Sequence, residues 1–396
     1  MLRKIFIGLW FAYFAYCLFF LISKREEYHW DFKMQYFSAK LLAEGKNPYN
    51  PEITRTEIGT PLWYAYPPLT AWFYRLFNLL PYETANLLFF FIKVVILIFL
   101  LFFWSKHFLN QSLEPTFLFF CLLAFNSALF LDLRSGNINL FEQLLLWFGF
   151  YFFLKKKFLL FSVFILIAAT FKGTPLFFLL LLLTTDCRKK YLFFINSIGL
   201  FLGYLLLQYA LWPEMFRAYL EAAQKTLVER RIICPTTIGL IYEIFDLLAR
   251  RRAIVVNQEW QIALFIVIAT IVLILSFKAY IILIRFGHEN KEKLLLFGLC
   301  FVYALITLRM KDYAYVLLLV PSYFIIKNTS YQKIFPFLFV ISILTAAKNV
   351  TLPDLGSVYL VIWEYYPLLL AYLMWGLYLR EIFILKKPLI TDRAFP

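Results

Sequence analysis

Runs of about 20 apolar residues fill most of this chain, and they restrict its fold more than any other feature of the sequence. A helix needs about 20 mostly apolar residues to cross the hydrocarbon core of a bilayer. Hydrophobic residues make up 63% of the 396 positions and charged residues only 16%, so no stretch is polar enough to form a soluble domain. The sequence predicts one all-α polytopic membrane domain over residues 1–396.

Twelve apolar runs predict a bundle of about twelve membrane-spanning helices. The runs lie near residues 5–22, 84–104, 115–133, 137–154, 158–171, 174–184, 191–211, 260–284, 294–308, 312–326, 334–347 and 362–385. No small-residue cleavage site follows the first run, so we expect an uncleaved span rather than a signal peptide. Two short runs meet at residues 172–175, which predicts a broken helical hairpin buried in protein.

The topology depends on a further apolar run, 67–81, which is bracketed by prolines. If it crosses the membrane, the basic loops 155–157 and 188–190 face outward. If it lies on the outer surface, these loops face the cytoplasm together with both termini and the basic residues near 327–333 and 386–387, as the positive-inside rule favours. We therefore expect a multi-pass protein of the plasma (inner) membrane, with outer juxtamembrane helices in two outer loops, 23–83 and 212–259.

The net charge of +15 allows two kinds of partner, nucleic acid and anionic lipid. The basic residues are scattered among short loops without interleaved aromatic stacking positions, so we expect a lipid bilayer and no nucleic acid. Five cysteines without a Cys-x-x-Cys spacing and three distant histidines make a metal site unexpected.

Basic residues also stand at the ends of spans that face outward, where topology gives no reason for positive charge. They are Arg134, Lys172, Arg309 and Lys311. Placing a charge at membrane depth costs about 2.5–3.5 kcal/mol, so each needs a partner. One alternative is a salt bridge between helices, for example Arg309 with Asp312 or Arg134 with Asp132. The other is a shared site for an anionic lipid phosphate.

Asp31 follows the first span and is flanked by aromatic residues. It can act as a general base, or as the N-cap of a helix over residues 32–44 that ends at Gly45. The polar side chains Asn137 and Asn139, near the outer end of a span, can hydrogen-bond between helices or bind sugar hydroxyls. We expect Lys93, in the middle of a span, to be structural.

Four stretches together resemble glycosyltransferase family 87, the polyprenyl-phosphate-mannose-dependent mannosyltransferases of the GT-C superfamily. They are Asp31 with Ala39–Tyr49, then Tyr66–Leu69, Gly136–Asn139 and Ala169–Pro175. In the resemblance, the first is the outer loop, the second a proline-opened outer helix, the third a Gly-Gln-x-Asn element with Asn137 in place of Gln, and the fourth a Lys-Pro hairpin. The likeness covers residues 25–185 and implies a GT-C-like bundle.

The resemblance implies inverting transfer of a sugar, mannose in this family, from a polyprenyl-phosphate donor to a glycan or glycolipid acceptor. By this resemblance the reaction would take place on the outer face, in the cell envelope, without a cofactor. Asp31 would be the base, the four cations would bind the donor phosphate, and Tyr49, Tyr66, Asn137 and Asn139 would contact sugar or acceptor. Two alternatives remain: a transporter or flippase of lipid-linked sugars, and a lipid-linked glycan polymerase or ligase.

The topology can be tested by cysteine accessibility in intact cells. We expect Asn50→Cys to react with an impermeant maleimide added from outside and Asn110→Cys to react only after permeabilisation, because 67–81 does not cross. Labelling of both positions from outside would show that this segment is a span.

Overall fold

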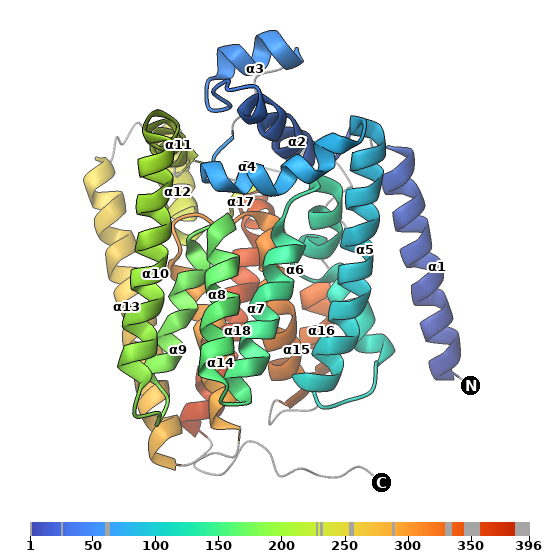
Figure 1. Cartoon of the computed structure of the whole chain (residues 1–396). Helices are drawn as coiled ribbons and strands as arrows, with labels where there is room; N and C mark the ends of the chain where they lie inside the picture. Colours follow the sequence, from blue (N-terminus) through green and yellow to red (C-terminus); the bar gives the residue numbers. More distant parts are fainter. Residues whose placement is uncertain are drawn as a thin grey trace. The chain divides into compact units, whose positions relative to one another are not determined.

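A computed structural model of the chain describes residues 2–24, 27–59, 64–226, 229, 233–252, 257–286, 290–328, 335–343 and 357–384 (Figure 1). All regular elements within these ranges are helical. The chain forms two compact units. Unit 1 comprises Met1–Trp10, Trp104–Leu131 and Glu229–Pro396, and unit 2 comprises Phe11–Phe103 and Asp132–Val228.

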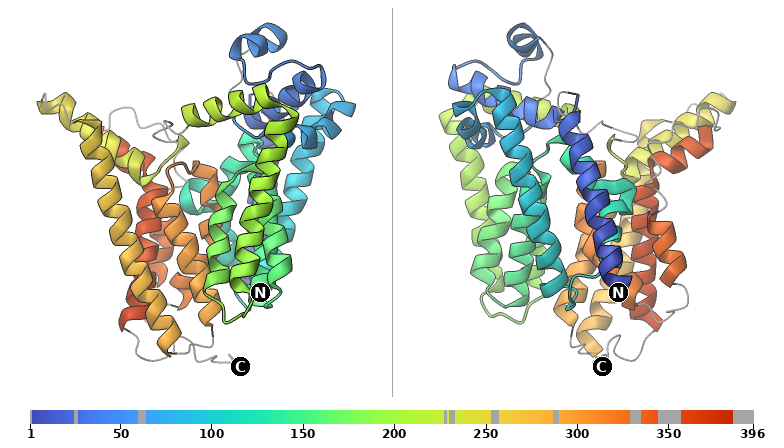
Figure 2. Two further views of the ribbon diagram at one scale, coloured as in Figure 1. Left: turned by 60° about the vertical axis from the view of Figure 1, so that its left-hand side comes forward. Right: turned by 90° about the vertical axis from the view of Figure 1, so that its right-hand side faces the viewer.

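Unit 2 contains most of the elements that precede residue 229. They are most of α1 (Leu2–Ser23) and of α5 (Tyr82–His107), together with α2 (Trp30–Ala43), α3 (Pro51–Ile58), α4 (Pro68–Tyr74), η1 (Arg75–Leu79), α7 (Asn139–Leu154), α8 (Phe158–Phe171), η2 (Thr174–Leu179), α9 (Leu180–Leu183), α10 (Lys190–Leu211) and α11 (Pro213–Thr226). The elements α2, α4 and α11 lie across the end of unit 2 at which α5 begins and α10 ends (Figures 1 and 2).

Unit 1 contains most of α6 and the second half of the chain. Its elements are α6 (Pro115–Ser135), α12 (Thr237–Arg252), α13 (Gln258–Phe286), α14 (Lys291–Ile306), η4 (Asp312–Leu318), α15 (Leu319–Asn328), α16 (Phe335–Ile343), α17 (Ser357–Glu364) and α18 (Tyr366–Ile384). The ends of two expected spans, 344–347 and 385, lie outside the described residues, as do the basic residues Lys333, Lys386 and Lys387.

The helices confirm an all-α membrane protein. Among the described residues, five helices are long and apolar enough to cross a bilayer: Lys4–Ser23, Tyr82–His107, Pro115–Ser135, Lys190–Leu211 and Gln258–Arg285. Apolar side chains of α10 and α13 are exposed on the protein surface, for example Leu206 and Ile266, as expected for helices that face lipid. The number of crossings and the single-domain organisation stay predictions. The segment 67–81 forms only α4 and η1, which are too short to span a bilayer.

Two apolar runs are interrupted, one as expected and one not. The predicted break between 158–171 and 174–184 is present: α8 ends at Phe171, Lys172 is extended, and a 3-10 helix follows. The span expected over 115–133 coincides with α6, but α6 is broken at Ala124–Ser127, where three successive residues have positive φ, and the sequence did not predict this break. A hydropathy pattern reports side-chain polarity and carries no signal for such a backbone break.

An aromatic core fixes α2 in unit 2. Phe32 is fully buried, and its ring stacks on Phe89 at 4.5 Å and meets the edge of Phe77 at 5.6 Å. The Tyr36 hydroxyl, one helical turn later, donates a hydrogen bond to the Leu80 carbonyl at 2.8 Å. Because Asp31 precedes Phe32 directly, this packing also fixes the position of the Asp31 backbone.

A buried ion pair joins α5 to the end of α6. Lys93 and Asp132 are both fully buried, and the Lys93 Nζ lies 2.5 Å from an Asp132 carboxylate oxygen and 2.5 Å from its backbone carbonyl. Removal of one member of a buried pair leaves an uncompensated charge, which is strongly destabilising. Lys93 is therefore structural, as the sequence predicted.

We expect Lys93→Met to lower the free energy of unfolding by about 3–5 kcal/mol, because it leaves the Asp132 carboxylate buried without its cation. Thermal unfolding of the detergent-solubilised variant measures this loss. Adding Asp132→Asn to Lys93→Met should restore part of the stability, and Lys157→Met, at an exposed lysine, is the control. An unchanged melting temperature for Lys93→Met would contradict the prediction.

Candidate active site

The polar residues of the first half of the chain meet at one end of unit 2. Four segments contribute: the start of α2, the loop before α4, the turn between α6 and α7, and the end of α8. The structure brings together Asp31, Tyr66, Asn137 and Lys172, which the sequence predicted as site residues. These residues are far apart in the chain, so their proximity is a property of the fold.

Asp31 lies in the first turn of α2, but it is not the helix cap. The N-cap is His29, in the left-handed conformation (φ 59°), so the N-cap interpretation of Asp31 was wrong. The His29 backbone N–H donates to the Arg134 carbonyl at 2.9 Å, and its ring Nδ1 lies 2.5 Å from the Asn86 side-chain oxygen. With His29 held in this way, the half-exposed Asp31 carboxylate is directed toward the turn between α6 and α7.

Gly136 allows this turn to approach α2 closely. Its φ is +68°, and a Cβ added there would lie 3.0 Å from the Phe32 Cβ and 3.1 Å from the His29 Cα. Both restrictions favour glycine, because other residues rarely adopt this backbone conformation and a side chain would contact α2. The neighbouring Asn137 therefore lies within hydrogen-bonding distance of Asp31.

Asn137 is the centre of the site. Its side-chain Nδ2 donates to the Asp31 Oδ2 at 2.7 Å and to the Tyr66 hydroxyl oxygen at 3.0 Å. Its Oδ1 accepts from the Asn139 backbone N–H at 3.0 Å and from the Lys172 Nζ at 3.3 Å. One buried amide thus joins the candidate base to the candidate phosphate-binding cation.

Lys172 stands at the break after α8 and has two neighbours besides Asn137. Its Nζ lies 3.4 Å from a Glu142 carboxylate oxygen and 5.9 Å from the centre of the Tyr66 ring. The Lys172 side chain is 24% exposed whereas that of Glu142 is 7% exposed, so the ammonium can meet a ligand while the carboxylate lies behind it.

A second layer of contacts supports Asn137. The Asn139 side chain, buried in α7, donates to Asp132 Oδ2 at 2.7 Å, and the Ser135 hydroxyl donates to the Asp132 carbonyl at 3.0 Å while accepting from the Asn137 N–H at 3.2 Å. Asp132 is in turn paired with Lys93. A sugar-binding role for Asn139 stays a prediction. In the sequence, the only indication of the Lys93–Asp132 pair is that each apolar run, 84–104 and 115–133, contains one of these opposite charges.

Arg134 is close to the site but has aromatic neighbours. Its guanidinium carbon lies 4.4 Å from the centre of the Tyr28 ring and 5.9 Å from that of Trp30. The alternative of an Arg134–Asp132 salt bridge was wrong, because the Asp132 carboxylate is bound to Lys93 and Asn139.

Arg309 and Lys311 belong to unit 1 and share an acidic partner. Glu229 Oε2 accepts from the Arg309 Nη2 at 3.0 Å and from its Nε at 3.2 Å, and it lies 2.6 Å from the Lys311 Nζ. The two cations are thus arranged around one carboxylate, a geometry that also suits a phosphate oxygen. Their role in phosphate binding stays a prediction.

Tyr49 supports Tyr66. The Tyr49 hydroxyl donates to the Tyr66 carbonyl at 2.7 Å, and both rings are more than nine-tenths buried. The Tyr66 hydroxyl faces Asn137, so it is the tyrosine group placed directly in the site. No group of three or more His, Cys, Asp or Glu side chains that could hold a metal occurs in the described ranges.

Comparison with known proteins identifies the family. The model of glycosyltransferase family 87 matches residues 64–308, well over half of the chain. This range contains Tyr66, Asn137 and Lys172, while Asp31 precedes it and Arg309 follows it. No curated protein and no solved structure matches the chain. On this match, and with membrane helices as its framework, the chain belongs to glycosyltransferase family 87.

Proposed function

We propose that this glycosyltransferase transfers a hexose, mannose, from a polyprenyl-phosphate donor to a hydroxyl group of a glycan or glycolipid acceptor on the outer face of the inner membrane. The observation that carries the proposal is the Asn137 amide, which holds Asp31 on one side and Lys172 on the other. Inverting transfer needs a base for the acceptor and a cation for the leaving group, and these two residues supply them.

Asp31 is the proposed general base. The acceptor oxygen attacks the anomeric carbon, its proton passes to the Asp31 carboxylate, and the bond from the anomeric carbon to the phosphate oxygen breaks with inversion. The hydrogen bond from Asn137 at 2.7 Å fixes the carboxylate so that it need not reorient during the reaction. Asp31 is half-buried, so part of the residue remains open to an acceptor.

Lys172 is the proposed partner of the leaving phosphate. Positive groups fixed before the reaction stabilise charge that develops on a leaving group. Its ammonium is partly exposed and adjoins Glu142 and Asn137, which hold it at the end of α8. Arg134, Arg309 and Lys311 are further phosphate-binding candidates from the sequence. A lipid phosphate donor also fits a protein whose helices are embedded in the bilayer.

We expect Asp31→Asn to lower turnover with polyprenyl-phosphate mannose by about 10²-fold or more, because the isosteric amide cannot accept the acceptor proton. Radiolabel transfer by the purified protein measures this effect. Glu44→Gln, at the other end of α2, is the control and should keep wild-type turnover. A folded Asp31→Asn protein with near-normal turnover would remove Asp31 from the mechanism.

We expect Lys172→Ala to weaken donor binding by about 1.5–3 kcal/mol, the usual effect of losing a charged hydrogen bond. Donor affinity and melting temperature should be measured on the same detergent-solubilised samples. Glu142→Gln is the matched variant, since it removes the salt bridge but keeps the cation. If both variants lose stability while donor affinity is unchanged in each, Lys172 serves only to connect α8 with α7.

A further inference from the structure

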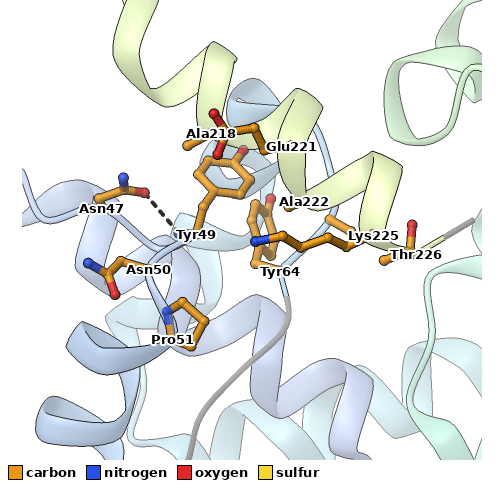
Figure 3. A pocket seen from close by; sticks show the side chains of 11 residues that line it. Asn47, Tyr49, Asn50, Pro51, Tyr64, Ala218, Glu221, Ala222, Lys225 and Thr226 are labelled. Atoms are coloured by element: carbon orange, nitrogen blue, oxygen red, sulfur yellow. Dashed lines mark hydrogen bonds between the residues drawn. The ribbon is translucent and has the colours of Figure 1, made fainter. Parts of the chain in front are cut away.

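A hollow lies beside the candidate active site in unit 2. It has a volume of about 250 Å³ and is formed by the turn 47–51 between α2 and α3, by residues 64–65, and by one face of α11 (Figure 3). The mechanism described above uses none of the α11 side chains. Pockets with aromatic walls and a few placed polar groups are typical sites for small ligands.

One face of α11 forms a wall with room for a ligand. Ala218, Glu221, Ala222 and Lys225 line the hollow, and their spacing of three and four residues places them on the same side of the helix. The side chains of Ala218 and Ala222 are small and therefore leave space for a ligand against this wall. Glu221 and Lys225 are exposed, and within the described part of the chain neither head group has a bonding partner. Their opposite charges cancel, which suits a neutral ligand with many hydroxyl groups.

The opposite side of the hollow is aromatic and amide-rich. The rings of Tyr49 and Tyr64 line it, with their centres 5.2 Å apart, and burial raises the pKa of both hydroxyls further above physiological pH. Asn47 and Asn50 use their side-chain oxygens to accept the backbone N–H groups of Tyr49 and Glu52. Their amide NH₂ groups can then donate to a hydroxyl at the rim.

Tyr64 and Tyr66 connect the hollow with Asp31. The Tyr64 and Tyr66 rings are 5.8 Å apart, and the Tyr66 hydroxyl meets the Asn137 amide that holds Asp31. A chain of two ring contacts and two hydrogen bonds thus leads from Tyr49, in the hollow, to Asp31. The hollow and the candidate site are thus built on one group of packed side chains, and a sugar residue bound in the hollow would lie next to the residues that hold Asp31.

We propose that the hollow is a binding subsite for a sugar residue of the acceptor, at a distance from the hydroxyl group that is attacked. The ligand class is a neutral oligosaccharide or the saccharide part of a glycolipid. The assignment to the acceptor rests on the proposed function, whereas binding of a saccharide to the hollow does not require catalysis.

The test is direct binding of mannotriose to the full-length protein in detergent. Saturation-transfer nuclear magnetic resonance detects the binding, and a titration gives the affinity. We expect the wild type to bind and Ala222→Leu, which fills the hollow, to bind at least 10-fold more weakly. Ala223→Leu is the matched control, because the neighbouring alanine does not line the hollow, and it should bind as the wild type does. Equal binding by the Ala222→Leu and wild-type proteins, or absence of binding to the wild type, overturns the proposal.

Lys225→Ala provides a second variant with little risk to folding, since its side chain is exposed, and Gln224→Ala is its control. We expect weaker mannotriose binding for Lys225→Ala alone, and in the transfer assay a raised KM for acceptor with kcat retained. Wild-type affinity in folded Lys225→Ala and Ala222→Leu samples would exclude the subsite. If the wild-type protein transfers no mannose from polyprenyl-phosphate mannose but the variants show the expected differences in mannotriose binding, the proposed donor is refuted and the saccharide site stands.

Discussion

The buried ion pair between Lys93 and Asp132 is the interaction on which the candidate site depends. Charges inside a membrane protein must be neutralised and hydrogen-bonded, and Asp132 satisfies this requirement through Lys93 and Asn139. The backbone carbonyl of Asp132 accepts a hydrogen bond from the Ser135 hydroxyl, which in turn accepts one from the Asn137 N–H. The turn that carries Asn137 is thus held in place by buried hydrogen bonds and the ion pair. Helix α2 packs against this turn at Gly136.

The helices were predictable from the sequence because their signal is long and local. Within the described residues, each of the five helices that are long and apolar enough to cross a membrane coincides with a predicted apolar run, and Gly45, just after α2, has the left-handed conformation suited to a helix end. The broken α6 was not predictable, since Ala124–Ser127 contains neither proline nor glycine. Residue preference made Asp31 one candidate for the N-cap of α2, but the helix is capped at His29, whose backbone N–H is bonded to Arg134, a residue distant in sequence.

The site was predictable in its residue types and only partly in its pairings. A lysine at a helix break and an aspartate after the first span are local features, so Lys172 and Asp31 could be selected. Their connection through Asn137 and Tyr66 needs four separated segments to meet, which no spacing rule provides. The family assignment supports an enzyme over a transporter of lipid-linked sugars. A glycan polymerase or ligase is also a glycosyl transfer enzyme, and acceptor identity is what distinguishes it from the proposed mannosyltransferase.

The Asn137 side chain has one further consequence. Its two N–H groups and its carbonyl oxygen are all engaged, so the amide cannot rotate without bringing its oxygen against the Asp31 carboxylate. Hydrogen bonds in such a chain polarise one another. In the proposed reaction Asp31 gains a proton, which would weaken the pull on the amide nitrogen and make the oxygen that faces Lys172 a poorer acceptor. The Lys172 ammonium would then be drawn more strongly toward the phosphate of the proposed donor, so that in this mechanism proton transfer at Asp31 and departure of the phosphate are coupled through a single planar amide.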